Sequence, residues 1–133
     1  MSPVNALLQA VHARLTGDAG LQALAGGGIH DRRLGRIDMP YLVIGSVETA
    51  DFSTGSEDGL EITLVLEAWS AISRREAEMT ADAVRGLMHE AELELEAAEL
   101  VSLRHRRTLS RREAKTALFV AEMRFRAVVE WGE

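Results

Sequence analysis

The stretch that decides the fold is Leu60-Glu-Ile-Thr-Leu-Val-Leu-Glu-Ala-Trp-Ser70, which is followed closely by Ser73-Arg-Arg-Glu76. Side chains alternate along the first segment, so that its leucines lie on one face and Trp69 lies on the other. This pattern predicts a half-buried strand over 60–70. Ser73 and Glu76 have the spacing of a capping box, and small and apolar residues then recur at helical spacing as far as Ala91. A strand that runs into a packed helix predicts a sheet with helices on one face.

Upstream of this stretch, the chain predicts one helix and one further strand. Ser2 and Pro3 favour a helix start, and apolar residues at three- and four-residue steps continue the helix to Leu15. Asp18 can cap a short second turn, after which residues 26–38 are expected to form a loop. Residues 41–49 are rich in β-branched side chains and predict a strand, whereas the polar, glycine-bearing residues 50–59 predict a hairpin loop.

Downstream, two more strands are expected. Glutamate and leucine alternate over 90–99, which we interpret mainly as a connection. Alternation over 100–109 predicts a strand with Val101, Leu103 and Leu109 on its apolar side, residues 110–113 predict a turn, and 119–131 predict a long final strand. The order helix, strand, strand, helix, strand, strand predicts an α+β fold: a four-stranded antiparallel sheet with two helices packed on one face.

Composition limits the class of protein. Residues 1–133, with 47% hydrophobic content, are expected to form a single domain with one core. The net charge of -6 repels a nucleic-acid backbone overall, and zero cysteines exclude disulfides and thiolate metal sites. Neither an 18-residue apolar stretch nor a basic leader followed by an apolar run occurs, so we expect a soluble protein without a targeting segment and without a membrane partner.

No motif for catalysis, metal binding or cofactor binding is apparent. The serines lie in no nucleophile motif, and the four histidines lie in separate elements without the spacing of metal ligands. The glycines at 26–28 lack the Lys-Ser/Thr of a phosphate-binding loop. We therefore expect no catalytic residue, no metal and no cofactor. Three classes stay open: a ring-forming structural protein, a small α+β protein-binding module or regulator, and a small enzyme.

One concentrated basic run is a candidate for contact with a partner. It comprises Arg104, His105, Arg106, Arg107, Arg111 and Arg112. On a strand, Arg104 and Arg106 would share a face about 7 Å apart. We favour pairing of these arginines with acids on a neighbouring strand, such as Glu122 or Glu130. Alternatively, Arg104, Arg106, Arg111 and Arg112 contact phosphate or the acidic surface of another subunit.

Two aromatic side chains are further interface candidates. Trp69 lies on the strand face opposite the leucines, where it either meets a partner or is covered by a loop of its own domain. Phe52 is the one apolar anchor of the 50–59 loop, and the same two alternatives apply to it.

Several segments together resemble the tail completion, or tail terminator, proteins of long-tailed bacteriophages and of the gene transfer agents derived from them. The amino-terminal helix that ends near Leu15 is one such element. The other matching segments are Ile29-His-Asp31, Met39-Pro-Tyr-Leu-Val-Ile-Gly45, Leu64-Val-Leu-Glu-Ala-Trp-Ser70 with its following helix, Leu100-Val-Ser-Leu-Arg104 and Met123-Arg-Phe-Arg-Ala-Val-Val129. They span nearly the whole chain.

The resemblance implies a structural role without an active site. It implies a homo-oligomeric, hexameric ring that sits on the last ring of the tail tube protein. Such a ring stops tube polymerisation and contacts the head-tail connector protein. Such a ring would lie at the head-tail junction of a particle assembled in the bacterial cytoplasm, and DNA would pass through its lumen without sequence-specific binding. The net charge of -6 would suit such passage if it lined the lumen.

Overall fold

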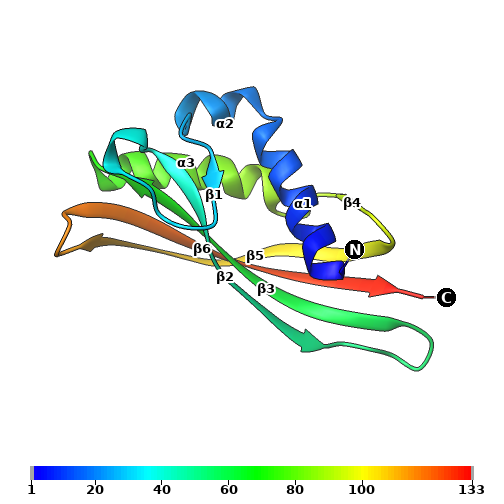
Figure 1. The fold of residues 1–133 in the computed structure, drawn as a ribbon. Helices are drawn as coiled ribbons and strands as arrows, with labels where there is room; N and C mark the ends of the chain where they lie inside the picture. The colour runs from blue at the N-terminus through cyan, green and yellow to red at the C-terminus, as the bar shows by residue number, and fades with distance from the viewer. Residues whose placement is uncertain (1, 133) are drawn as a thin grey trace.

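The computed structural model describes residues 2–132 and shows an α+β fold, in which helices lie on one face of a long curled sheet (Figure 1). The helices are α1 (Pro3–Thr16), α2 (Ala19–Leu24), the 3-10 turn η1 (Arg36–Asp38) and α3 (Arg74–Met88). The strands are β1 (Ile29–His30), β2 (Tyr41–Asp51), β3 (Asp58–Ser70), β4 (Glu94–Leu95), β5 (Ala98–Glu113) and β6 (Leu118–Trp131).

The sheet has more strands than the sequence predicts. Its order is β1-β2-β3-β6-β5-β4, and the four long strands β2, β3, β6 and β5 are antiparallel neighbours, as expected. The prediction of only four strands is wrong, because β1 pairs in parallel with Leu42 and Val43, and β4 pairs with Ala98 and Glu99. Both added strands have two residues, which is too short for an alternation pattern. The sheet is therefore mixed.

Three α-helices are present where two were predicted. The additional helix is α2, whose first turn is capped by the Asp18 carboxylate accepting from the Leu21 N–H at 2.9 Å. At the start of α1, the Ser2 hydroxyl accepts from the Asn5 N–H at 3.1 Å, as the Ser-Pro opening predicts.

The junction between β3 and α3 differs from a capping box in one respect. The Ser73 hydroxyl caps α3 by accepting from the Glu76 N–H at 3.1 Å. The Glu76 carboxylate, however, accepts from the hydroxyl of the fully buried Ser70 at 2.7 Å instead of turning back to the Ser73 backbone. Ser70 also accepts from the N–H groups of Ile72 and Ser73 at 3.0 and 3.2 Å. One side chain thus fixes the direction in which the chain leaves the sheet.

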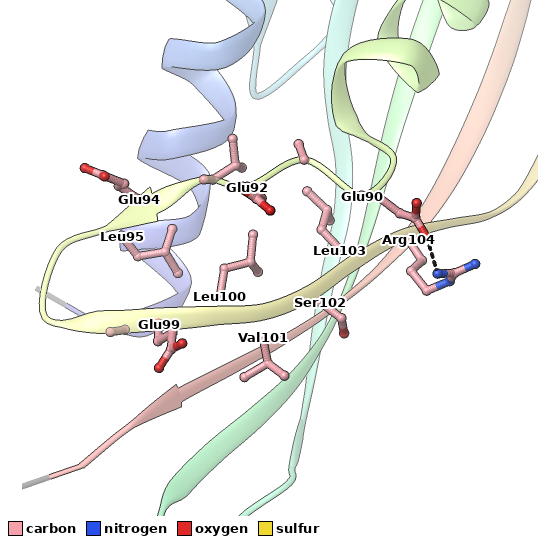
Figure 2. A pocket seen from close by; sticks show the side chains of 13 residues that line it. Glu90, Glu92, Glu94, Leu95, Glu99, Leu100, Val101, Ser102, Leu103 and Arg104 are labelled. Atoms are coloured by element: carbon pink, nitrogen blue, oxygen red, sulfur yellow. Dashed lines mark hydrogen bonds and ion pairs between the residues drawn. The ribbon is translucent and has the colours of Figure 1, made fainter.

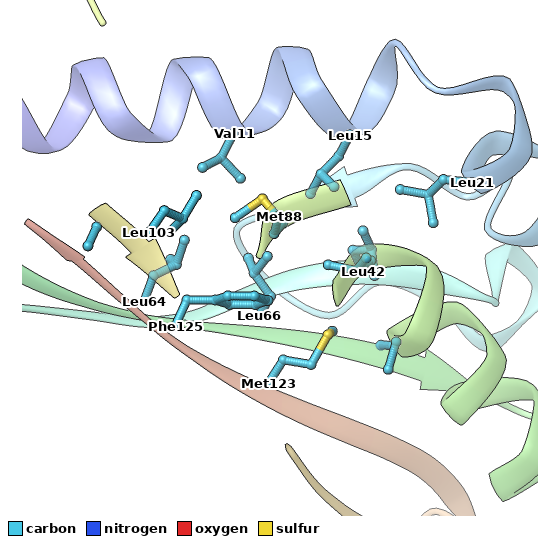
Figure 3. Packing of buried hydrophobic residues seen from close by; sticks show 14 of the residues in the cluster. Val11, Leu15, Leu21, Leu42, Leu64, Leu66, Met88, Leu103, Met123 and Phe125 are labelled. Atoms are coloured by element: carbon cyan, nitrogen blue, oxygen red, sulfur yellow. The ribbon is translucent and has the colours of Figure 1, made fainter. Parts of the chain in front are cut away.

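The main core lies between the helices and one face of the sheet, and the strand faces are those that the alternation predicts. Leu64 and Leu66 of β3 pack beside Met123 and Phe125 of β6, beneath Met88 of α3 (Figure 3). All five are fully buried. The helices contribute Val11, Leu15 and Leu21 to the same cluster.

A second, smaller core covers part of the opposite face. It is formed by Tyr41, Val43, Trp69, Leu118 and Val120. Leu34 and Met39, from the segment between β1 and β2, pack against it. At this end of the sheet both faces are covered. The far part of the β2–β3 hairpin extends beyond the helices (Figure 1).

The predicted facing of β5 is wrong. The pairing register with β6 shifts between Leu100 and Ser102 and again between His105 and Arg107. Each bulge changes the phase of the alternation. Val101 and Leu109 are consequently about half exposed, whereas Leu103 keeps the buried position that was predicted for it.

The turn between the last two strands also lies further along the chain than predicted. Residues 110–113 continue β5 and pair with 118–121 of β6, so their capping-box letters mark neither a helix nor a turn. The chain reverses over 114–117, where Ala117 has a φ of 59°. The hairpin is therefore four residues longer on its β5 side than the sequence interpretation gave.

Candidate subunit interface

The outer face of the sheet, opposite the main core, carries a concentration of arginines from β5 and β6. We call Arg104, Arg106, Arg107, Arg124 and Arg126 the arginine face. The register places Arg104 directly opposite Arg126 and Arg107 directly opposite Arg124. Like charges opposite one another on neighbouring strands destabilise a sheet. An opposed pair that no carboxylate neutralises therefore destabilises the isolated subunit.

Two members of the arginine face are neutralised by nearby carboxylates. Arg104 forms an ion pair with Glu90 at 2.6 Å, and the Arg126 guanidinium donates to the Glu61 carboxylate on β3. The other three, Arg106, Arg107 and Arg124, have no carboxylate within 4.0 Å among residues 2–132. These three cations are thus unpaired within the described chain.

The unpaired arginines surround a shallow hollow on the outer face. Its volume is about 460 Å³, and its lining comprises Glu61, Thr63, Arg106, Arg107, Arg124 and Arg126. Four guanidinium groups around one depression present many N–H donors to an anionic partner. The arrangement suits carboxylates or phosphates.

The remaining arginine candidates behave differently from one another. Arg111 forms the predicted cross-strand pair with Glu122 at 2.8 Å, so the expectation of pairing with Glu122 is confirmed for this residue. Arg104 pairs with Glu90 rather than with Glu122 or Glu130. Arg112 is exposed near the β5–β6 turn. Arg111 and Arg112 lie outside the hollow, and their part in an interface stays a prediction.

Phe52 remains on the surface. Its side chain is 43% exposed, and the Arg126 guanidinium lies 5.5 Å from its ring centroid. The loop that carries it is closed by hydrogen bonds from Phe52 N–H to Gly59 C=O at 2.9 Å and from Thr54 N–H to Glu57 C=O at 2.8 Å. Phe52 therefore extends the arginine face with an apolar group toward the β2–β3 hairpin.

Trp69 is not available to a partner on this surface. It is only 4% exposed, because the segment before β2 folds over it and Arg33 stacks 4.8 Å from its ring centroid. The expectation of an exposed Trp69 is wrong, and the alternative of a covering loop is what the structure shows. Tyr41 fixes that loop by accepting from the Leu34 N–H at 2.8 Å and donating to the Leu34 C=O at 2.7 Å. Arg33 also pairs with Glu113 at 2.8 Å.

An acidic counterpart lies beyond the edge of β5. Glu92, Glu94, Glu96 and Glu99, which we call the glutamate ridge, are all exposed and have no basic side chain within 4.0 Å among residues 2–132. Between this segment and β5 lies a groove of about 680 Å³, into which Leu95 and Leu100 point (Figure 2). Figure 2 also shows Glu94 pointing away from these leucines. Glu94 is thus presented outward.

Sequence reasoning missed two parts of this surface. It did not connect Arg124 and Arg126, which lie in the predicted final strand, with the basic run, because that connection depends on the β5–β6 register. The alternation of glutamate and leucine over 90–99 could have indicated the ridge, since period-two spacing in an extended segment separates the two kinds of side chain.

Few groups in the described chain have the perturbed acidity that often marks catalytic sites. Burial, with the nearby Arg85 charge, lowers the pKa of His105, and burial raises the pKa of Tyr41. A hydrogen bond from Arg33 lowers the pKa of Glu113. Packing or ion pairing explains each of these three pKa shifts.

No group of three or more metal-ligating side chains occurs among residues 2–132, and no helix there is long and apolar enough to cross a membrane.

Two kinds of comparison with known proteins agree. A family model described as "Tail completion protein gp17" matches residues 9–130. A chain of the solved structure "Virion of native gene transfer agent (GTA) particle" is similar with a TM-score of 0.87 and 30% sequence identity, over 96% of this chain and 96% of that chain. No curated protein gives a significant match. Since the family model spans residues 9–130 and the fold is matched over nearly the full length of both chains, this chain belongs to the Tail completion protein gp17 family.

Proposed function

We propose that this protein is a structural subunit of a phage-like particle, in which several copies form a ring at the head-side end of the tail tube. The ring ends tube polymerisation and joins the tube to the head-tail connector. The observation that carries this proposal is the match of the whole fold, at a TM-score of 0.87 over 96% of both chains, to a protein of an assembled gene transfer agent particle.

The surface supports assembly rather than turnover. Apolar and aromatic groups beside arginines are enriched in protein interfaces, and here Phe52, Val101 and Leu109 are exposed around the arginine face. Unpaired arginines and unpaired glutamates occupy separate parts of one subunit. A heterologous contact can bring such different surfaces together and generate a ring when the rotation closes. We propose a hexamer and no catalytic activity.

Termination follows physically from this arrangement. A ring that binds the upper surface of the last tube ring covers the place where the next tube subunit would add. Its own upper surface differs from that of the tube protein, so polymerisation stops and the connector can bind instead. DNA would cross the ring without sequence-specific contacts.

The test is deletion of the gene followed by electron microscopy of the particles. The proposal predicts tails of abnormal length or heads and tails that are not joined, with rescue by the gene supplied in trans. Normal particles after deletion would contradict the proposal and would favour a small binding module or regulator.

A further inference from the structure

We propose that the arginine face of one copy binds the glutamate ridge of a neighbouring copy, and that this heterologous contact is the main polar interface between subunits. The inference deepens the proposed function and rests on it, since it concerns copies assembled within a particle. The occupant of the arginine face is thus a second copy of this chain.

Charge complementarity is the first argument. Arg106, Arg107 and Arg124 lack carboxylate partners on one part of the described chain, while the four ridge glutamates lack basic partners on another. Within one subunit, the opposed Arg107–Arg124 pair and the opposed acids Glu94–Glu99 and Glu99–Glu130 leave like charges side by side. Docking the ridge on the arginine face relieves both kinds of repulsion at once.

Spacing is the second argument. In an extended chain, side chains on the same face repeat about every 7 Å. Glu92 and Glu94 have this two-residue spacing in the segment that leads into β4, as do Arg124 and Arg126 on β6, whereas Glu96 lies in the turn between β4 and β5. When this part of the ridge lies along the arginine face, Glu92 and Glu94 meet guanidinium groups at a matching interval, which favours charge-assisted hydrogen bonds.

A protein partner fits this surface better than DNA. Phe52, Val101 and Leu109 are 43%, 52% and 48% exposed and border or interleave with the arginines. Apolar side chains of this size gain from contact with another protein and gain little along a phosphate backbone. In addition, the net charge of -6 repels a polyanion as a whole, whereas it does not prevent a local contact between unlike patches.

Cysteine cross-linking tests the contact directly, because the natural chain has no cysteine. Particles are prepared from cells in which the gene carries Glu96→Cys together with Arg106→Cys, and they are oxidised and separated on a non-reducing gel. We expect a ladder of covalent dimers and higher species that dithiothreitol abolishes. Each single variant, and the control pair Glu48→Cys with Arg106→Cys, should give no ladder. Glu48 is an exposed acid on β2, at the other side of the sheet.

Charge exchange provides the second readout. The variants Arg107→Glu/Arg124→Glu and Glu94→Arg/Glu96→Arg should each reduce the yield of joined particles at least tenfold, and the combined variant should restore most of it. Arg107→Lys/Arg124→Lys is the charge-preserving control, and circular dichroism of the purified chains checks folding. Full yield for both reversed variants would overturn the proposal.

The outcomes separate this proposal from the function on which it rests. If an immunoblot finds the protein absent from finished particles, both the proposed function and the proposed contact between copies are wrong. If the protein is present but the Glu96–Arg106 cysteine pair gives no ladder, the contact is wrong and the function stands. Contact with DNA instead is indicated if arginine reversal lowers the particle yield, no ladder forms and the combined exchange does not restore the yield.

Discussion

Tyr41 is the residue that attaches the loop before β2 to the outer face of the sheet. Its hydroxyl both accepts from and donates to the backbone of Leu34, and its ring is fully buried. Tyr41→Phe should lower the free energy of unfolding by about 1–3 kcal/mol, because a partly buried N–H and C=O of Leu34 lose their partner. Urea denaturation followed by tryptophan fluorescence measures the change. Leu109→Ala, at a half-exposed position, is the control, with an expected change within about 0.5 kcal/mol.

His105 should make the stability of the fold depend on pH. Burial and the nearby Arg85 charge lower its pKa in the folded state, so between the folded and unfolded pKa values the unfolded chain binds more protons. Its contribution is therefore fully present above the unfolded pKa of about 6.5 and is lost as the pH falls through 6.5 toward the lower folded value. Denaturation of wild-type protein and His105→Gln at pH 7.5 and pH 5.5 tests this. The variant should lose less stability on acidification than wild-type protein, and an equal loss would contradict the assignment.

At the scale of elements, the β3–α3 junction depends more on Ser70 than on the helix cap itself. Ser70→Ala removes the hydroxyl that accepts from two N–H groups and donates to Glu76 in a buried site. We therefore expect the free energy of unfolding to fall by about 2–3 kcal/mol. Ser73→Ala removes one capping bond and should cost about 1 kcal/mol. Thermal or urea denaturation of the two variants gives the comparison. A larger loss for Ser73→Ala would contradict the assigned roles.

The β5–β6 hairpin should show a conflict between stability and assembly. Arg107→Glu places an acid directly opposite Arg124 and replaces a repulsive pair with an attractive one. We expect the free energy of unfolding of the isolated subunit to rise by about 0.2–1 kcal/mol, while the yield of joined particles falls. Equilibrium denaturation and particle counts measure the two effects. If Arg107→Glu is less stable than wild-type protein, the opposed Arg107 and Arg124 do not destabilise the isolated subunit.

The elements that sequence patterns predicted well are those with uninterrupted periodicity. The faces of β3 and β6 follow from strict alternation, and α3 follows from the Ser73 cap and its apolar stripe. The facing of β5 could not be predicted in the same way, because bulges beside Leu100 and His105 change the phase of the pattern without a signal in the letters. The two-residue strands β1 and β4 are set by their neighbours rather than by their own sequence.

Only the part of the candidate site that lies within one continuous segment of the sequence was predictable. The basic run in β5 was visible in the sequence and Phe52 was a candidate, but the arginine face arises from cross-strand register and includes residues of β6. The alternation of β3 placed Trp69 on the face opposite the leucines, where exposure was expected. A loop without a periodic pattern covers it instead, through contacts of Arg33 and Leu34. Tertiary coverage of this kind follows from long-range contacts.

At the scale of the whole molecule, the distribution of charge matters more than its total. The net charge of -6 gives no indication of the arginine face, on which cations predominate. Segregated charge of both signs on one small subunit favours ordered contact between copies, and raised salt should weaken such contact because it screens exposed charges. Assembly in several copies is consequently the central claim for this protein.

The most direct measurement of that claim is cryo-electron microscopy of intact particles in which this protein carries a small carboxy-terminal label. We expect one closed ring of labelled copies between the head-side end of the tail tube and the connector, and no label along the tube. Label spread along the tail, or particles that contain none of this protein, would contradict it.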